Sequence, residues 1–199
     1  MRCPSYLLLL VIFLAQCRFQ RNRIEGIPIT DSYNKCEEAG YDFGEIITLG
    51  DSNNRFMVSL PYEWAIQESY SDTLYGIVAS NIWEAEENPA LFMSFSVTGY
   101  STADSLHSYL MHELQTLKAD KNMKVLETGE TTLNERKAYW VKFRNTEKDN
   151  QFLNLVLYAK SPERGEIFLI HSCVADVAEP DKRLCAMKKL AMSFEFVTR

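Results

Sequence analysis

Histidines are the first residues to test for chemistry, and the chain has three: His107, His112 and His171. The first two are five residues apart in a segment with helical spacing, so their side chains do not converge on one ion. His171 and Cys173 share a face of a strand-like run, but with Cys185 they make one ligand too few for a closed structural zinc site. The sequence also has no His-x-x-x-His, Cys-x-x-Cys or glycine-rich loop before a helix. These patterns predict no catalytic centre, metal site or cofactor.

Acidic and aromatic residues offer two weaker signals. The acidic run 84–87 is expected to be a solvated turn ending at Asn88-Pro89, because no apolar residues surround it to shift a pKa. Aromatic residues would mark a binding surface if exposed, whereas packing in the core or at an edge is their commoner role. Both interpretations stay open for the aromatic residues of the first third of the domain: Tyr62, Trp64, Tyr70, Tyr75 and Trp83.

The N-terminal sequence has the pattern of an export signal. Arg2 is followed by an unbroken apolar run from Leu7 to Ala15. Nine residues of helix extend only about 14 Å, far short of the roughly 30 Å hydrocarbon core of a bilayer. The sequence therefore predicts a signal peptide over residues 1–16 rather than a membrane span.

The end of this run, Leu14-Ala15-Gln16-Cys17, resembles the lipobox of bacterial lipoproteins, in which the Cys is acylated and becomes the mature N-terminus. This resemblance implies that Cys17 is a lipid anchor holding the protein at a membrane surface. Because Gln16 stands where a small residue is usual, a cut nearby that yields a freely secreted protein remains the alternative. The resemblance extends to lipoprotein sorting rules: the residue after the Cys is Arg18 rather than Asp, which implies the periplasmic side of the outer membrane, rather than retention at the inner membrane, in a Gram-negative cell.

The chain is acidic, with a formal net charge of −6 over 199 residues. This balance excludes a general nucleic-acid binder, which needs clustered positive charge to displace phosphate counterions. The basic stretch 18–23 is the exception, and it is either a solvated tether or a contact to anionic headgroups.

Five cysteines are present, in a chain predicted to enter an oxidising compartment. Removal of Cys3 and acylation of Cys17 leave three. Cys173 lies late in a strand-like run and Cys185 in a helix-like run, joined by a short turn, so packing of the helix on the strand would bring them within disulfide range. We predict a Cys173–Cys185 disulfide with Cys36 unpaired. The alternatives are that Cys36 takes one of the two, or that Cys173 and Cys185 are small buried hydrophobic residues.

Segment 17–54 is irregular and interrupted by glycines, which predicts a tether followed by a strap over a folded unit of residues 55–199. Within that unit, alternation of apolar residues predicts strands, and spacing of three and four predicts two helices. The first helix is expected after the N-cap residues Ser101 and Thr102, and the second from Pro180. Short connections between strands predict an α+β domain with a mainly antiparallel sheet. The predicted strands are 56–60, 75–83, 91–97, 137–143, 152–159 and 166–174, with weaker candidates at 63–69 and 129–133.

The order of these elements resembles the PsbP-like (PsbP/DcrB/Mog) family over residues 55–199. The residues that carry the resemblance are the strand followed by Pro61-Tyr62-Glu63-Trp64, the strand containing Gly129, Lys137-Ala138-Tyr139, and the closing helix that ends in Ser193-Phe194. The resemblance implies an α/β/α sandwich whose relatives act by binding and share no common reaction. It assigns no binding residues, because no motif marks them.

We therefore expect a non-enzymatic, lipid-anchored protein of the cell envelope that binds another envelope protein or helps to assemble one. Two alternatives remain. One is an enzyme with a site built from scattered residues such as His171, and the other is a carrier with an apolar pocket between sheet and helix.

Overall fold

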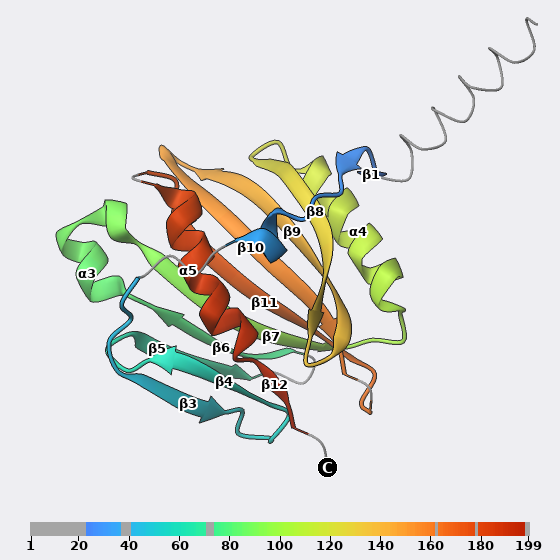
Figure 1. Ribbon diagram of the computed structural model, residues 1–199, viewed down its shortest axis with the longest axis horizontal. Helices are drawn as coiled ribbons and strands as arrows, with labels where there is room; N and C mark the ends of the chain where they lie inside the picture. Colours follow the sequence, from blue (N-terminus) through green and yellow to red (C-terminus); the bar gives the residue numbers. More distant parts are fainter. Residues whose placement is uncertain (1–22, 37–40, 71–73, 162, 178, 198–199) are drawn as a thin grey trace, which may run out of the picture.

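A computed structural model describes residues 23–36, 41–70, 74–161, 163–177 and 179–197. Its centre is a seven-stranded sheet in which every neighbouring pair is antiparallel (Figure 1). In spatial order the strands are β5 (Ala65–Tyr70), β6 (Leu74–Ser80), β7 (Met93–Ser101), β11 (Glu166–Ala175), β10 (Asn150–Lys160), β9 (Arg136–Glu147) and β8 (Met123–Leu133).

Two helices cover opposite faces of this sheet. The helix α5 (Pro180–Met192) packs on β10 and β11, and α4 (Leu106–Ala119) packs on β8 and β10. The face that carries α5 is extended by a three-stranded sheet. These three strands are β12 (Glu195–Phe196), β4 (Phe56–Pro61) and β3 (Ile46–Gly50). The remaining short elements are β1 (Arg23–Ile24), β2 (Ile27–Pro28), α2 (Ser32–Lys35), α3 (Ile82–Glu87) and the 3₁₀ turn η1 (Pro89–Leu91).

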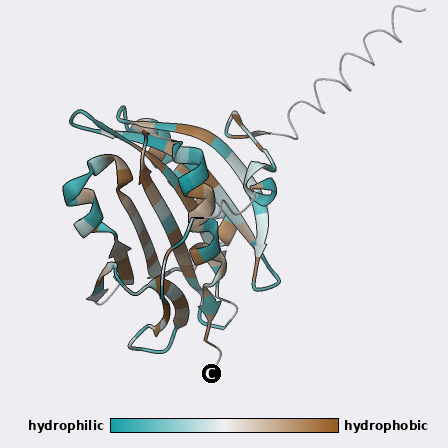
Figure 2. Ribbon diagram, turned by 60° about the vertical axis from the view of Figure 1, so that its left-hand side comes forward, coloured by the Kyte–Doolittle hydropathy of each residue, from teal (hydrophilic) through white to brown (hydrophobic). Residues whose placement is uncertain are grey.

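Alternation along the strands produces the two layers of core. In β7 the buried residues Met93, Phe95 and Val97 alternate with partly exposed ones, as the period of two predicted. Figure 2 shows the hydrophobic residues concentrated on the strands of the central sheet. The predicted α+β sandwich with a mainly antiparallel sheet is confirmed.

Aromatic rings connect the small sheet to the central one. Phe56 of β4 lies 5.6 Å from Phe168 of β11 and 5.5 Å from Phe194, measured between ring centroids. All three side chains are fully buried. Full burial of each contributes roughly 1.5–3 kcal/mol, so this cluster fixes the end of α5 against both sheets.

Both predicted helices are present. In α4, Leu110, Leu114 and Leu117 are buried, as the spacing predicted. The expected N-cap at Ser101 and Thr102 was wrong, because β7 continues through Ser101. Ser105 caps the helix instead, with its hydroxyl accepting the Ser108 N–H at 3.0 Å. In the part of the chain that the structure describes, no helix combines the length and the apolar character needed to cross a bilayer.

The expected strap contains more regular structure than predicted. β3 pairs with β4 in register Ile47↔Leu60, so the folded unit includes residues before 55. Upstream, Tyr33 of α2 is 5% exposed and lies 5.9 Å from the Trp140 ring, and Ile29 pairs with Thr128 of β8. Each of these elements is too short to show a period, so the sequence alone did not predict them.

The structure corrects the predicted disulfide. Cys185 is bonded to Cys36, with the Cα atoms 5.7 Å apart, and Cys173 is a free thiol. The reason is the alternation of β11: Val174 belongs to the core beneath α5, so the side chain of Cys173 points to the opposite face of the sheet. Burial raises the pKa of the Cys173 thiol to about 12, so it stays protonated.

Candidate binding site

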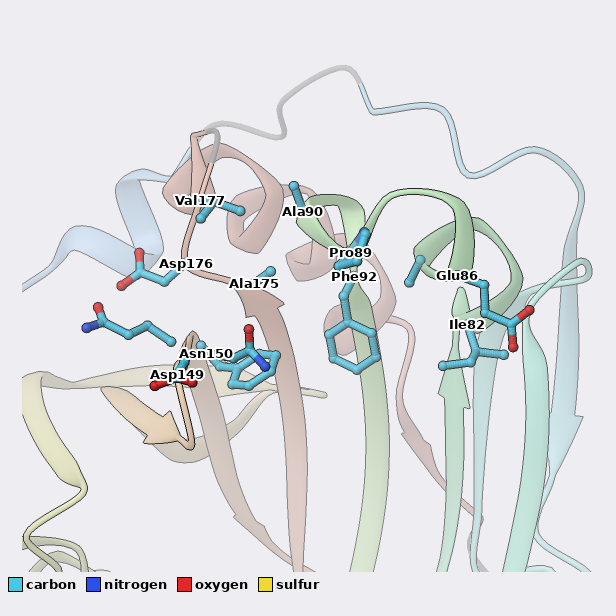
Figure 3. Close-up of a pocket in the computed structure, with 13 residues that line it drawn as sticks. Ile82, Glu86, Pro89, Ala90, Phe92, Asp149, Asn150, Ala175, Asp176 and Val177 are labelled. Carbon is cyan, nitrogen blue, oxygen red and sulfur yellow. The ribbon is translucent and has the colours of Figure 1, made fainter.

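A groove of about 660 Å³ lies where the strands of the central sheet end (Figure 3). One wall comes from α3 and η1, and the other from the β9–β10 turn and the end of β11. We call it the α3 groove, and it is lined by Ile82, Ala85, Glu86, Pro89, Ala90, Phe92, Asp149, Asn150, Gln151, Phe152, Ala175, Asp176 and Val177.

The floor of the α3 groove and part of each wall are apolar. The rings of Phe92 and Phe152 meet edge to face with centroids 5.8 Å apart. Ile82 and Val177 are 36% and 48% exposed, so apolar surface is left in contact with water on both walls. Such surface is the usual feature of a site that another molecule covers.

Asn81 fixes the α3 wall. This side chain is 3% exposed and sits directly before the helix. Its amide oxygen accepts the Met93 N–H at 2.7 Å, and its amide nitrogen donates to the Leu91 carbonyl at 2.9 Å. These bonds tie both ends of the α3–η1 segment to the start of β7.

Arg183 of α5 joins the two walls. Its guanidinium donates to the carbonyl of Ala90 in η1 at 2.7 Å and to that of Ala175 at 2.6 Å, and it also bonds the carbonyl of Val177. The side chain is 7% exposed, and burial lowers its pKa. One buried cation thus holds the groove open at a set width, which reduces the ordering that a ligand must impose.

The charged residues of the α3 groove are all acidic. Asp176 forms an ion pair with Arg144 of β9. Glu86 and Asp149 are exposed and have no cationic partner among the described residues. The rim therefore favours a ligand that carries positive charge beside its apolar groups.

A second hollow of about 470 Å³ lies on the other side of α3. We call it the aromatic pocket, and it is lined by Tyr41, Asp42, Phe43, Gly44, Glu63, Trp64, Asn81, Trp83 and Glu84. The Phe43 ring lies 4.9 Å from Tyr41 and 5.9 Å from Trp64, between centroids. Because Trp83 and Glu84 belong to α3, the pocket and the α3 groove share one six-residue helix.

The structure divides the aromatic residues singled out in the sequence. Trp64 and Tyr75 are buried, whereas Tyr62, Tyr70 and Trp83 are 61%, 43% and 63% exposed. Trp83 was expected at the end of a strand, and residues 84–87 in a turn, but the chain leaves β6 at Ser80 and forms α3. The Asn81 side chain makes no cap hydrogen bond to α3 and instead bonds Leu91 and Met93, the residues that follow the helix in sequence.

The residues proposed for an enzyme or a zinc site lie elsewhere. His171 Nε2 is 2.9 Å from the side-chain oxygen of Asn154, and the His171 ring stacks on Phe143 at 6.2 Å. Burial lowers the pKa of His171 to about 4, so the ring is neutral at pH 7. Its hydrogen-bond partner is an amide rather than a carboxylate. Among the described residues no three potential metal ligands come together.

A hollow between the central sheet and α5 was the expected mark of a carrier. A hollow that lies there, beside Tyr33, Trp140 and Leu184, measures about 140 Å³. This volume is well below the roughly 300–1,000 Å³ of small-molecule sites.

Solved structures of other proteins share this architecture. LpqN of Mycobacterium tuberculosis, described as involved in cell envelope biogenesis, aligns with a TM-score of 0.52 and 11% identity over 77% of this chain and 91% of its own. The Ran-binding protein Mog1p of Saccharomyces cerevisiae aligns with a TM-score of 0.53 and 11% identity over 77% of this chain and 96% of its own. The fold is PsbP/Mog-like. Cyanobacterial PsbP from Synechocystis aligns less well, with a TM-score of 0.48 and 14% identity over 79% of this chain and 95% of its own. No protein-family model and no curated protein matches the sequence.

Several residues of the PsbP/Mog-like domain's α3 groove escaped the sequence analysis. Phe92 and Phe152 lie at the ends of strands, where an aromatic residue cannot be told from a core residue by its sequence pattern. Arg183 is one of several basic residues in an amphipathic helix, and nothing in the sequence distinguishes it from the neighbouring lysines. The aromatic residues singled out in the sequence include Trp83, which lines the neighbouring aromatic pocket rather than the groove. The predicted anchor, Cys17, lies outside the described residues.

Proposed function

We propose that this protein is a non-enzymatic lipoprotein of the cell envelope whose PsbP/Mog-like domain binds another exported protein through the α3 groove. The observation that carries the proposal is the exposed apolar lining of that groove, held between walls that Asn81 and Arg183 fix. The expected ligand is a protein segment that presents apolar side chains flanked by basic ones, because the free charges at the rim are Glu86 and Asp149.

A protein fits the site better than a small metabolite does. The groove and the aromatic pocket lie on two sides of α3, which also carries the exposed Trp83 ring. Aromatic residues are enriched at protein interfaces. Two proteins of similar fold point the same way, since Mog1p is Ran-binding and LpqN is involved in cell envelope biogenesis.

The anchor and the location are part of the proposal. Acylation of Cys17 would leave the domain attached to the periplasmic side of the outer membrane through the tether that begins at residue 18. Mass spectrometry of the mature N-terminus tests this directly. A diacylated or triacylated Cys17 is the expected result, and an unmodified Cys17 or a cut at another residue would leave a secreted protein in its place.

Site-specific photo-crosslinking tests the binding site. A photoreactive side chain at Ile82 or at Glu86 should yield a discrete adduct with one exported protein in intact cells. The same group at Ser108, which is exposed on α4 on the opposite side of the sheet, is the control. Equal adducts from all three positions, or none from the α3 groove, would contradict the proposal.

A pair of matched variants separates binding from folding. Val177→Lys places a positive charge, which repels a basic ligand, in the groove at a residue that is 48% exposed, so it should abolish the adduct and leave the fold intact. Met192→Lys makes the same change at a 40% exposed residue that lines neither hollow, and it should leave the adduct unchanged. Circular dichroism of both variants checks that each one is folded.

A further inference from the structure

We infer that the aromatic pocket is a subsite for an arginine side chain of the protein that occupies the α3 groove. The identity of that protein rests on the proposed function above. The subsite itself rests on the rings and carboxylates that line this pocket, and it can be tested without the partner.

The rings of the pocket suit a planar cation. Phe43 meets Trp64 edge to face, with an interplanar angle of 76°, and Trp83 stands 63% exposed on the facing helix. An exposed indole face attracts a cation more strongly than a phenol or phenyl ring does. A guanidinium also stacks flat on an aromatic ring, which the compact ammonium of lysine cannot do.

The charges of the pocket select the same ligand. Its three ionisable side chains other than Tyr41 are Asp42, Glu63 and Glu84, and no lysine, arginine or histidine lines it. Glu84 accepts a hydrogen bond from Asn81 at 2.9 Å with one oxygen, which leaves the other free. None of the three carboxylates is in an ion pair with a described residue. A bidentate pair with arginine would satisfy two of these oxygens at once.

The nearest cation already has other partners. Arg183 lies close enough to Tyr41 to favour its ionised form, but its guanidinium bonds three backbone carbonyls. Burial and the neighbouring Glu84 carboxylate outweigh it and raise the pKa of Tyr41. The negative charge of the pocket is therefore left for a ligand to neutralise.

The position of the pocket relates it to the α3 groove. Within one helix, Ile82 and Glu86 line the groove while Trp83 and Glu84 line the pocket. Because the two sites share the helix, one short segment of the partner can place an apolar side chain in the groove and an adjacent arginine in the pocket. The apolar contacts of the groove favour any apolar segment, and the subsite makes binding depend on an arginine at the adjacent position of the partner's sequence.

The test uses the purified protein with its disulfide intact and acetyl-arginine amide as the probe. The chain has three tryptophans, so the indole N–H resonances report the site with an internal control. Saturable shifts are expected for Trp83 and Trp64, whereas Trp140, buried in the central sheet, should not respond. Acetyl-citrulline amide, which has the same shape without the charge, should give no saturable shift.

Variants assign the binding to individual residues. Trp83→Ala should abolish the response of Trp64, and Glu63→Gln should weaken binding about threefold or more. Glu87→Gln is the matched control, since this exposed residue of α3 lines neither hollow. No saturable shift with the arginine probe, equal shifts with citrulline, or equal binding of tetramethylammonium would each overturn the inference.

The two proposals fail separately. A crosslinked adduct from the α3 groove combined with no arginine binding removes the subsite and leaves the proposed function in place. Arginine binding combined with no adduct leaves the subsite and removes the proposed protein partner.

Discussion

Replacement of both bonded cysteines, Cys36→Ser with Cys185→Ser, should lower the free energy of unfolding by about 2–5 kcal/mol. The bond joins residues 149 apart in the sequence. For a closed loop of that length, the chain-entropy relation gives about 5 kcal/mol at 25 °C. A domain of this size has a total of roughly 5–15 kcal/mol, so the change should be large.

Contacts around the bond set the lower end of that range. Without the disulfide, Tyr33 still packs against Trp140, and the Lys188 ammonium still donates to the Tyr33 carbonyl at 3.0 Å. These contacts keep α2 near α5 in part of the molecules. Loss of the bond therefore costs less than the full entropy of an open chain.

Equilibrium unfolding in guanidinium chloride, followed by tryptophan fluorescence, measures the effect. Cys173→Ser is the matched control, because Cys173 is the free thiol and its removal should change stability by less than 1 kcal/mol. Peptide mapping without reduction should recover Cys36 linked to Cys185. Recovery of Cys173 linked to Cys185, or a double variant as stable as the parent, would refute the assignment.

Three further predictions test the fold and the walls of the groove. Gly129→Ala should lower the free energy of unfolding in urea by about 1–3 kcal/mol, because a Cβ would lie 2.5 Å from the Trp140 ring. A change below about 0.5 kcal/mol would contradict that packing. Arg183→Met should lower stability by roughly 3 kcal/mol or more and broaden the Ala90 amide resonance, since it removes three hydrogen bonds to backbone carbonyls. An unchanged Tm would argue against this role of Arg183 in joining the two walls. Burial holds the pKa of His171 at about 4 in the folded state, below its unfolded value near 6.5, so the unfolded state binds the proton first as the pH falls. Stability from this group should therefore decline between pH 6.5 and pH 4 by about 3 kcal/mol in total, and His171→Gln should flatten that part of the pH profile.

Much of the architecture was predictable because it depends on local period. The alternation in β7 and the leucine spacing in α4 each appear within a dozen residues, and both elements formed, with ends that differ from the predicted ones. The cap of α4 was misplaced because β7 continues as far as Ser101, which depends on its pairing with Glu166 of β11. A partner strand far along the chain decides such a boundary.

The site was less predictable. Val177, Phe92 and Phe152 come from three separate stretches of chain, and each looks like an ordinary apolar residue by itself. Trp83 could be recognised as an aromatic worth testing, but its exposure follows from the turn that Asn81 stabilises. The exposure of a side chain depends on the residues that lie beside it in space, and these are often distant from it in the sequence.

The sequence by itself determined the class of fold, the acidic balance and the prediction of an exported chain with Cys17 at its start, because these depend on composition and on residues close together. Only the tertiary structure decided that Cys185 is bonded to Cys36 rather than to Cys173. Cys173 and Cys185 are near neighbours in sequence, but a pleated strand turns alternate side chains to opposite faces. Cys173 therefore faces away from the helix that follows it, and a residue 149 positions from Cys185 becomes its partner.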